Sequence, residues 1–201
     1  MDFSELVESR QSFHSFSEEE IGEEELREIF EEVRRSPTAW NLQPYEFLVL
    51  DSEEKKEDAY KSSNDQEFLL DADKIVVVMG DERIDTHAEQ AFSDAVEKGY
   101  MTQGEAEEFR QAVSTYSERG EDFVSAFLNK QCSFACCFLM LAAWNRGIGS
   151  CPVAGFDAEE LSGRLDLDEH LRTMLMLPLG YPEEDREKKW RRKAGDFYSI
   201  V

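Results

Sequence analysis

Residues 121–146 carry the sequence EDFVSAFLNKQCSFACCFLMLAAWNR, the longest helical pattern in the chain. From Cys132 to Ala143 nearly every residue is apolar, so the second half of this helix has almost no polar face. Gly147 follows, and glycine is the usual residue just beyond a helix C-terminus. A helix that is apolar all round must be enclosed. In a domain this small, enclosure is easiest between a sheet and a second subunit, which predicts a homodimer.

Shorter elements are predicted on both sides of this helix. Helical patterns cover residues 3–10 with Ser4 as the N-cap, 23–35, 85–98, 104–118, and a segment opened by a capping box of Asp157 and Glu160. Strands are predicted at residues 47–50, 75–79 and 174–179, and the entirely apolar run at 75–79 indicates a buried central strand. This mixture of local strands and helical blocks predicts the α+β class. No repeat or Pro/Gly/Ser linker interrupts the chain, so we expect one domain over residues 1–201.

The charge balance excludes several functions. The 201 residues include 45 Asp and Glu against 22 Lys and Arg, a net charge of −23. Such a field repels phosphate backbones and anionic lipid, which argues against nucleic-acid or membrane partners. The apolar stretches are shorter than the roughly 20 residues of a transmembrane helix, and no cationic leader opens the chain, so we expect a cytoplasmic protein.

The acidic residues lie between well-patterned apolar positions, so they form solvated helix faces rather than disorder. Two interpretations stay open: an ordinary acidic protein, or a halophilic one whose carboxylate surface is adapted to high salt. The scarcity of lysine favours the second. Cys132, Cys136, Cys137 and Cys151 form no C-x-x-C motif, and we expect Cys132 and Cys136 to pack in the core rather than bind metal.

A basic tail is the strongest functional feature. Six of the cations fall within eight residues, at Arg186, Lys188, Lys189, Arg191, Arg192 and Lys193. In so acidic a chain this cluster predicts an anion site suited to a phosphate, the alternative being a strap that pairs with acidic helices. Arg10 supplies a matching cation near the other terminus, so two basic segments could converge on one anion.

Two stiff loops add further candidates. Residues 36–45, SPTAWNLQPY, combine two prolines with the amides of Asn41 and Gln43. Residues 151–156, CPVAGF, are small enough for backbone N–H groups to approach a ligand closely. Simple turn chemistry would also explain the first loop. No G-x-G-x-x-G or G-x-x-x-x-G-K-[ST] motif is present, which excludes nucleotide binding by a Rossmann turn or a P-loop.

Four motifs in order resemble the flavin-dependent nitroreductase family. They are RQSFHSF at 10–16, SPTAWNLQPY at 36–45, GIGSCPVAGFD at 147–157, and LPLGYP at 177–182 followed by the basic tail. The resemblance spans about residues 3–198. It implies an α+β fold with a central, mainly antiparallel sheet flanked by helices. It also implies a homodimer with one FMN at each subunit interface, the long helix at that interface, and NADH or NADPH as electron donor.

The resemblance also implies roles for individual residues. The flavin phosphate, ribityl chain and pyrimidine edge would contact Arg10, Gln11, Ser12 and His14. The FMN bound mainly by the partner chain would be reached by Pro37, Thr38, Ala39 and Asn41. The ring would meet Asn64, Gln66, Pro152, Val153, Ala154 and Gly155, and the phosphate would be held by Lys189, Arg191 and Arg192. No side-chain acid or base is expected, because the flavin N5 carries the chemistry.

Hydride would pass from NAD(P)H through the flavin to a nitroaromatic, a quinone or a similar small acceptor, and a shared flavin face predicts ping-pong kinetics. Flavin, enone or ferric-chelate reduction on the same scaffold is an alternative, because acceptor choice is expected to depend on variable loops around residues 85–118. A second alternative is a non-catalytic module in which the basic tail binds an acidic partner or a nucleotide.

Overall fold

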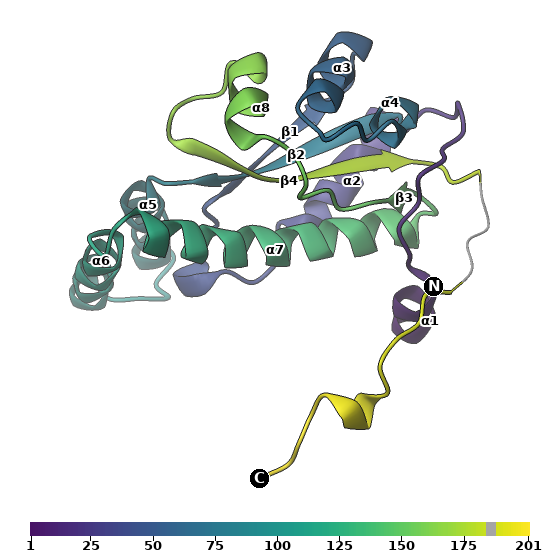
Figure 1. The fold of residues 1–201 in the computed structure, drawn as a ribbon. Coiled ribbons are helices and arrows are strands. Elements are labelled where there is room, and N and C mark those ends of the chain that lie inside the picture. The colour runs from purple at the N-terminus through teal and green to yellow at the C-terminus, as the bar shows by residue number, and fades with distance from the viewer. Residues whose placement is uncertain (184–187) are drawn as a thin grey trace.

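The computed structural model describes residues 1–183 and 188–201, and its centre is one antiparallel sheet (Figure 1). The strand order is β1-β2-β4-β3. The strands are β1 (Tyr45–Leu50), β2 (Lys74–Asp81), β3 (Gly149–Ser150) and β4 (Leu171–Gly180). β2 is buried along its whole length and pairs with β1 and β4, which confirms the central strand predicted at 75–79. The antiparallel sheet flanked by helices confirms the predicted fold class.

Alternate residues of β2 serve two hydrophobic cores. Val76 and Val78 pack with helices α2 (Glu23–Val33) and α7 (Glu121–Asn145) on one face of the sheet. Ile75, Val77 and Met79 pack on the other face with α3 (Glu53–Lys61), α4 (Phe68–Asp71) and α8 (Ala158–Leu165). Figure 1 shows the resulting layers, with α7 on one side of the sheet and α3 and α8 on the other. The period-2 side-chain pattern of a strand therefore explains the arrangement.

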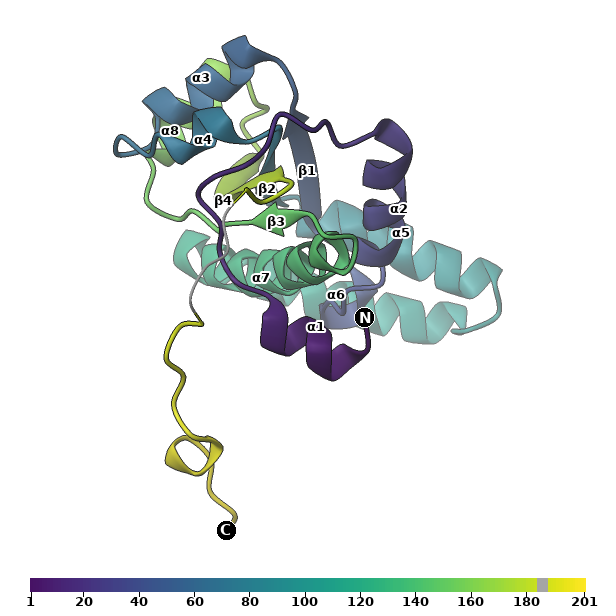
Figure 2. The ribbon, with the colours of Figure 1, turned by 90° about the vertical axis from the view of Figure 1, so that its right-hand side faces the viewer.

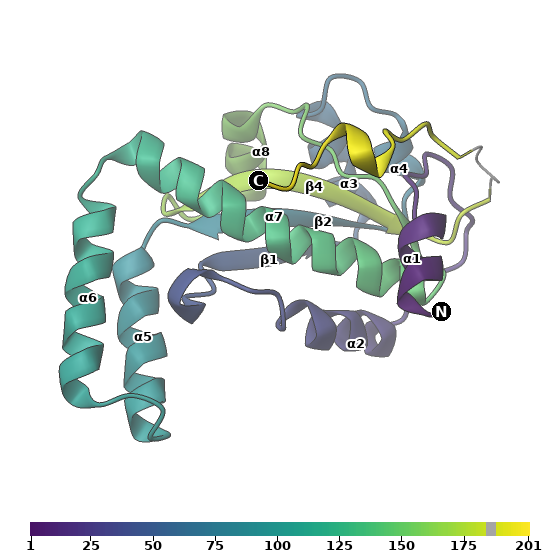
Figure 3. The same ribbon diagram turned by 90° about the horizontal axis from the view of Figure 1, so that it is seen from below.

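Helix α7 confirms the predicted long helix almost to the residue, and Gly147 beyond it has a φ of 81°, the left-handed conformation of a C′ residue. Its core face includes Cys132 and Cys136, at 0% and 1% exposed. The other face is open within this chain, with Phe134 49% and Phe138 37% exposed. Figure 3 shows α7 crossing the front of the molecule with its middle uncovered. The sheet and α2 thus enclose one side of the helix only.

Length and composition alone would let α7 span a membrane. Half of its most apolar window is buried inside the protein, the usual situation of a core helix. The buried residues lie against the sheet and α2, so packing within the domain accounts for the apolar character of this face.

Some predicted boundaries need correction. α1 (Phe3–Ser9) is capped by Asp2 rather than Ser4, because the Asp2 carboxylate accepts from the Glu5 N–H at 3.0 Å while Glu5 accepts from the Asp2 N–H. α2 ends two residues earlier than predicted. Asp157 caps α8, but the Glu160 carboxylate binds Arg164 instead of completing the capping box.

Five short elements were not predicted. They are α3, α4, β3 and two 3₁₀ helices, η1 (Ala39–Asn41) and η2 (Ala194–Asp196). α3 buries only Lys56 and Ala59, so its sequence carries little hydrophobic periodicity. The α5 (Ile84–Glu97) and α6 (Gln103–Ser117) helices do match their predictions, and Figure 3 shows them projecting as a hairpin from one end of the molecule.

Two glycines allow the N-terminal segment to lie against the sheet. Phe13 and Phe16 pack over Gly149 and Gly180, where an added Cβ would lie 2.7 Å and 2.8 Å from the phenylalanine rings. Those distances are too short for any other residue without a shift. Ser12 also bridges to Ser150 in parallel, so residues 10–16 run beside β3 (Figure 2). This contact brings the start of the chain to the edge of the sheet.

Candidate functional site

The two basic segments of the chain line one pocket. Arg10 and Gln11 from the N-terminal segment face Lys189 and Arg191 from the tail across a cavity of about 770 Å³. The tail is tied to α1 by an ion pair of 2.7 Å between Lys188 Nζ and Glu8 Oε1. The side-chain hydrogen bond and charge of Lys188 hold the pKa of Glu8 below its usual value. Residues near opposite termini thus meet, as the sequence suggested.

Three cations of this pocket have no close carboxylate among the residues that the structure describes. Within residues 1–183 and 188–201, no carboxylate lies within 4.0 Å of Arg10, Lys189 or Arg191. Glu8 and Glu183 also line the pocket, and Glu8 is engaged by Lys188. Guanidinium and ammonium groups without a close carboxylate in the described parts of the chain are suited to binding an anion. Arg186 lies outside the described residues.

A second group of predicted residues adjoins this pocket through the same N-terminal segment. The His14 Nε2 lies 3.3 Å from the Cys151 Sγ, and the His14 ring stacks on Phe68 with centroids 4.3 Å apart. Gln66 Nε2 donates to the Gly155 carbonyl at 2.8 Å, and Asn64 Nδ2 donates to the same oxygen at 3.4 Å. Both amides therefore fix the 151–155 loop, a role that the sequence did not indicate.

The 151–155 loop presents only part of its length to solvent. Pro152, Ala154 and Gly155 are exposed, whereas Val153 is 3% exposed and packs in the core. The Val153 N–H donates to the Met176 carbonyl at 2.8 Å, and its own carbonyl accepts from the Met176 N–H. The pairing with β4 therefore occupies both backbone groups of Val153, and its place beside the flavin ring stays a prediction.

Four predicted residues lie elsewhere in the chain. Pro37, Thr38, Ala39 and Asn41 belong to the η1 loop, which is attached to the middle of α7 by a 2.9 Å hydrogen bond from the Ala39 N–H to Gln131 Oε1. The pocket adjoins the end of α7, where Trp144 Nε1 donates to Ser9 Oγ at 2.9 Å. At 1.5 Å per residue, Gln131 and Trp144 are about 20 Å apart along the helix. One chain therefore does not bring this loop to the pocket.

Arg192 is not among the described residues that line the pocket, and its role at the phosphate stays a prediction. It hydrogen-bonds to the Asp196 carbonyl and stacks over Phe197 at 5.7 Å, within the tail itself. Two residues not predicted from the sequence complete the pocket region: Trp144, which packs on Phe13 at 5.2 Å, and Phe68 under His14. Trp144 belongs to the apolar pattern of the long helix, Phe68 lies outside the predicted elements, and no sequence signal separates either from core residues.

The core cysteines have no part in this site. Burial raises the pKa of both Cys132 and Cys136 to about 12, so neither thiol ionises near neutral pH. This agrees with the predicted packing role.

Residues 7–181 match the family model described as the nitroreductase family. The chain belongs to the nitroreductase family. Nitroreductases are oxidoreductases that use FMN with NADH or NADPH as electron donor, and this chain is a nitroreductase-family NAD(P)H oxidoreductase.

Individual relatives are similar to this chain over most or all of its length. It is 28% identical over 204 residues to MhqN of Bacillus subtilis (strain 168), named as a candidate NAD(P)H nitroreductase, with 100% of this chain and 99% of the relative covered. It is 27% identical over 175 residues to the CLA biosynthesis enone reductase of Lactiplantibacillus plantarum, covering 83% of this chain and 79% of that protein. A nitroreductase structure from Exiguobacterium sibiricum, solved in complex with FMN, matches the fold with a TM-score of 0.90 at 23% identity and covers 100% and 98% of the two chains.

The residues of the pocket fit the cofactor of the nitroreductase family. A flavin mononucleotide needs cations for its phosphate and a stiff, sterically open backbone beside its ring. Arg10, Lys189 and Arg191 supply the first, and the exposed Ala154–Gly155 backbone supplies the second. A Cβ at Gly155 would lie 3.7 Å from Gln66 Nε2, so this position is not crowded.

Proposed function

We propose that this protein is a homodimeric FMN-dependent oxidoreductase that carries a hydride from NADH or NADPH to a nitroaromatic, a quinone or a similar small acceptor by a ping-pong mechanism. The observation that carries the proposal is the meeting of Arg10 with Lys189 and Arg191 in one pocket beside the 151–155 loop. We expect one domain over residues 1–201 and a cytoplasmic location, where the electron donors are found.

The chain's own residues would bind and orient the cofactor. Arg10, Lys189 and Arg191 would hold the phosphate by charge-assisted hydrogen bonds. Gln66 and Asn64 hold the Gly155 carbonyl, and this would keep the Ala154 and Gly155 N–H groups directed at the polar edge of the ring. When bound, FMN supplies the hydride-transfer chemistry. His14, backed by Phe68 and Cys151, would lie at the pyrimidine edge.

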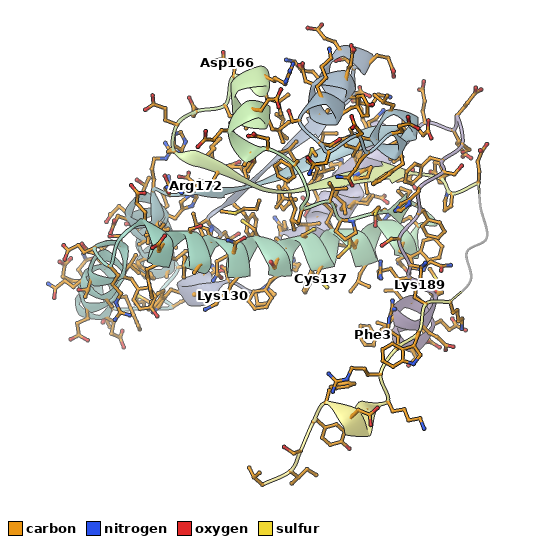
Figure 4. All side chains as sticks on the ribbon, in the orientation of Figure 1. Phe3, Lys130, Cys137, Asp166, Arg172 and Lys189 are labelled. Carbon is orange, nitrogen blue, oxygen red and sulfur yellow. The ribbon has the colours of Figure 1, made fainter. Side chains whose placement is uncertain are left out.

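A second copy of the chain would complete the site. The exposed face of α7 includes Lys130, Phe134, Cys137 and Phe138, and Figure 4 shows Lys130 and Cys137 on the side of α7 away from the sheet. Gln131 of α7 holds the η1 loop, and Trp144 of the same helix adjoins the pocket. Cys137 and Phe138 lie midway between these two positions. We place the twofold axis of the dimer there. That symmetry would move the η1 loop of each chain to the pocket of its partner.

The C-terminal tail supports the same assembly. It leaves the body of the protein as an extended segment (Figure 1), with Trp190 81%, Tyr198 62% and Ile200 90% exposed. Large apolar side chains gathered on one exposed segment are typical of an interface. We infer that the tail runs along the partner subunit after passing its own pocket.

Colour and kinetics test the proposal. We expect the purified protein to be yellow and to bleach anaerobically when NADH or NADPH is added. Double-reciprocal plots against a nitroaromatic or quinone acceptor should be parallel. Intersecting plots would contradict the ping-pong mechanism, and a colourless protein that FMN cannot reconstitute would favour a non-catalytic module.

Enone reduction is a second candidate, favoured by the similarity to an enone reductase. The same reduced protein would be offered nitroaromatics, quinones, flavins, ferric chelates and α,β-unsaturated ketones under anaerobic conditions. A kcat/KM for enones at least tenfold above that for nitroaromatics and quinones would assign this activity instead.

A further inference from the structure

Arg119, in the turn between α6 and α7, has no acidic partner among the residues that the structure describes. Throughout the described parts of the chain, most lysines and arginines have a carboxylate within 4.0 Å, as in the pairs Arg110–Glu89 and Arg146–Glu32. No carboxylate of residues 1–183 or 188–201 lies that close to Arg119. Its sequence neighbours Glu118 and Glu121 are acidic, so an ion pair would be readily available.

The Arg119 guanidinium lies over two aromatic rings. Its Cζ lies 4.6 Å from the Tyr116 ring centroid and 4.9 Å from the Phe123 ring centroid. The two rings contact each other edge to face at 4.7 Å. Cation–π contacts of this kind orient a guanidinium while leaving its N–H donors available to an anion.

The same rings connect Arg119 to the η1 loop. Tyr116 packs edge-on against Trp40 of η1 with centroids 5.2 Å apart, and Ala39 of η1 is bonded to Gln131. Trp40 and Asn41 have φ values of 51° and 57°, so the loop has a defined left-handed conformation. Arg119 is therefore one ring away from the loop that, in the proposed dimer, reaches the partner's FMN.

A cation at this position would favour binding of the electron donor. A reduced nicotinamide dinucleotide carries a pyrophosphate, and a protein of net charge −23 repels it. The cations of the basic pocket are committed to the FMN phosphate in the proposed function. A further guanidinium near the ring site would offset the repulsion and select donors that carry phosphate.

We propose that Arg119 binds a phosphate of NADH or NADPH in the partner subunit's site and so strengthens binding of the electron donor; this inference rests on the proposed function. The phosphate belongs either to the pyrophosphate, which both donors share, or to the 2′-phosphate of NADPH. Arg119 would act on donor binding, with no part in FMN binding.

The test compares Arg119→Leu with a charge-matched control, Arg27→Leu. Arg27 is 63% exposed on α2 and pairs only with Glu24 on the same helix, so its loss changes the net charge equally. The FMN-loaded dimers would be reduced anaerobically by NADH, by NADPH and by N-benzyl-1,4-dihydronicotinamide, which has no phosphate. A calorimetric titration with 1,4,5,6-tetrahydro-NAD, which cannot donate hydride, measures binding without turnover.

We expect Arg119→Leu to raise the Kd for a phosphate-bearing donor about tenfold, the usual cost of one charge-assisted hydrogen bond. The FMN content of Arg119→Leu and its rate of reduction by N-benzyl-1,4-dihydronicotinamide should equal those of the parent. Arg27→Leu should match the parent in every measurement. If the Kd rises for both NADH and NADPH and tetrahydro-NAD also binds more weakly, Arg119 contacts the pyrophosphate. If the Kd rises for NADPH alone, Arg119 contacts the 2′-phosphate.

Unchanged Kd values for both dinucleotides would overturn the inference, and so would an equal loss with the phosphate-free donor. Those results leave the proposed function intact, because the protein would still be reduced. A parent protein that binds no FMN, or that is reduced by none of the three donors, would refute the proposed function and this inference together.

Discussion

Asp81 is a buried charge with a complete set of partners. It is 1% exposed at the end of β2 and accepts hydrogen bonds from the Arg83 backbone N–H at 2.9 Å, the Arg83 guanidinium at 2.7 Å and His87 Nε2 at 3.0 Å. Burial by itself would raise the pKa of the Asp81 carboxyl, but these hydrogen bonds and the His87 charge hold it well below its usual range. The ionised form therefore stabilises the fold.

Replacing Asp81 with Asn should lower the free energy of unfolding at pH 7 by about 2–3 kcal/mol, because Arg83 and His87 lose their charged acceptor. Since the pKa is lower in the folded state, the carboxylate's contribution is present above the unfolded pKa of about 4 and is lost as pH falls through the folded pKa. Urea unfolding measured from pH 7 to pH 3 should show that the difference in free energy of unfolding between the parent and Asp81→Asn becomes smaller below about pH 5.

Asp94→Asn is the control for Asp81→Asn, since Asp94 is 57% exposed and pairs with Lys98 on its own helix. It should change the free energy of unfolding by less than about 0.5 kcal/mol. A loss of free energy of unfolding in Asp81→Asn that is equally large at pH 3 and pH 7 would contradict the stabilising role of the Asp81 charge.

At the scale of elements, the C-terminal tail combines anchoring and binding. Lys188 attaches it to α1, and the next cations face the pocket. Lys189→Glu with Arg191→Glu should therefore weaken FMN binding at least about 100-fold, as expected when two charge-assisted hydrogen bonds are lost. Fluorescence titration of FMN into the apoprotein measures this effect.

The control for the tail must change charge without disturbing packing. Lys61→Glu with Lys98→Glu meets this condition, since the two side chains are 45% and 55% exposed. Lys55 and Lys56, an obvious pair from the sequence, do not, because Lys56 is buried and its Nζ donates to the Ala72 carbonyl at 3.1 Å. Equal losses of FMN affinity in the tail and control variants would mean that the tail acts only through the net charge of the protein and not through specific phosphate contacts.

At the scale of the whole molecule, α7 decides whether the proposed dimer forms. Phe138→Lys would place a charge near the twofold axis, so we expect a monomer by light scattering and at least a tenfold loss of FMN affinity. Leu70→Lys is a matched control, because Leu70 is 38% exposed, against 37% for Phe138, and lies on α4 across the sheet. A Phe138→Lys protein that remains dimeric would rule out this interface.

The acidic surface gives a second prediction for the whole molecule. Repulsion within a net charge of −23 is screened by salt, since the Debye length falls from about 10 Å at 0.1 M to about 3 Å at 1 M. If the protein is halophilic, Tm should rise by roughly 4–8 °C between 0.1 M and 2 M KCl, which corresponds to about 2 kcal/mol. A flat or falling Tm would indicate an ordinary acidic protein.

Local patterns were sufficient for most of the elements. Residues close together in sequence determine the apolar run of α7, the i, i+3 spacing of Leu26 and Ile29 in α2, and the continuous apolar run of β2. These elements can therefore be predicted without knowledge of tertiary contacts. The charged α3 and the two-residue β3 were missed, because their stability comes from what they pack against.

The sequence by itself determined the fold class, the long core helix and the chemical character of the basic tail, because periodicity and charge are properties of neighbouring residues. Only the tertiary structure decided that Arg10 and Arg191 share a pocket and that Val153 faces the core. It also decided that the η1 loop and the pocket contact α7 at points about 20 Å apart along the helix. These are contacts between residues far apart in sequence, and they depend on how the sheet and α7 pack.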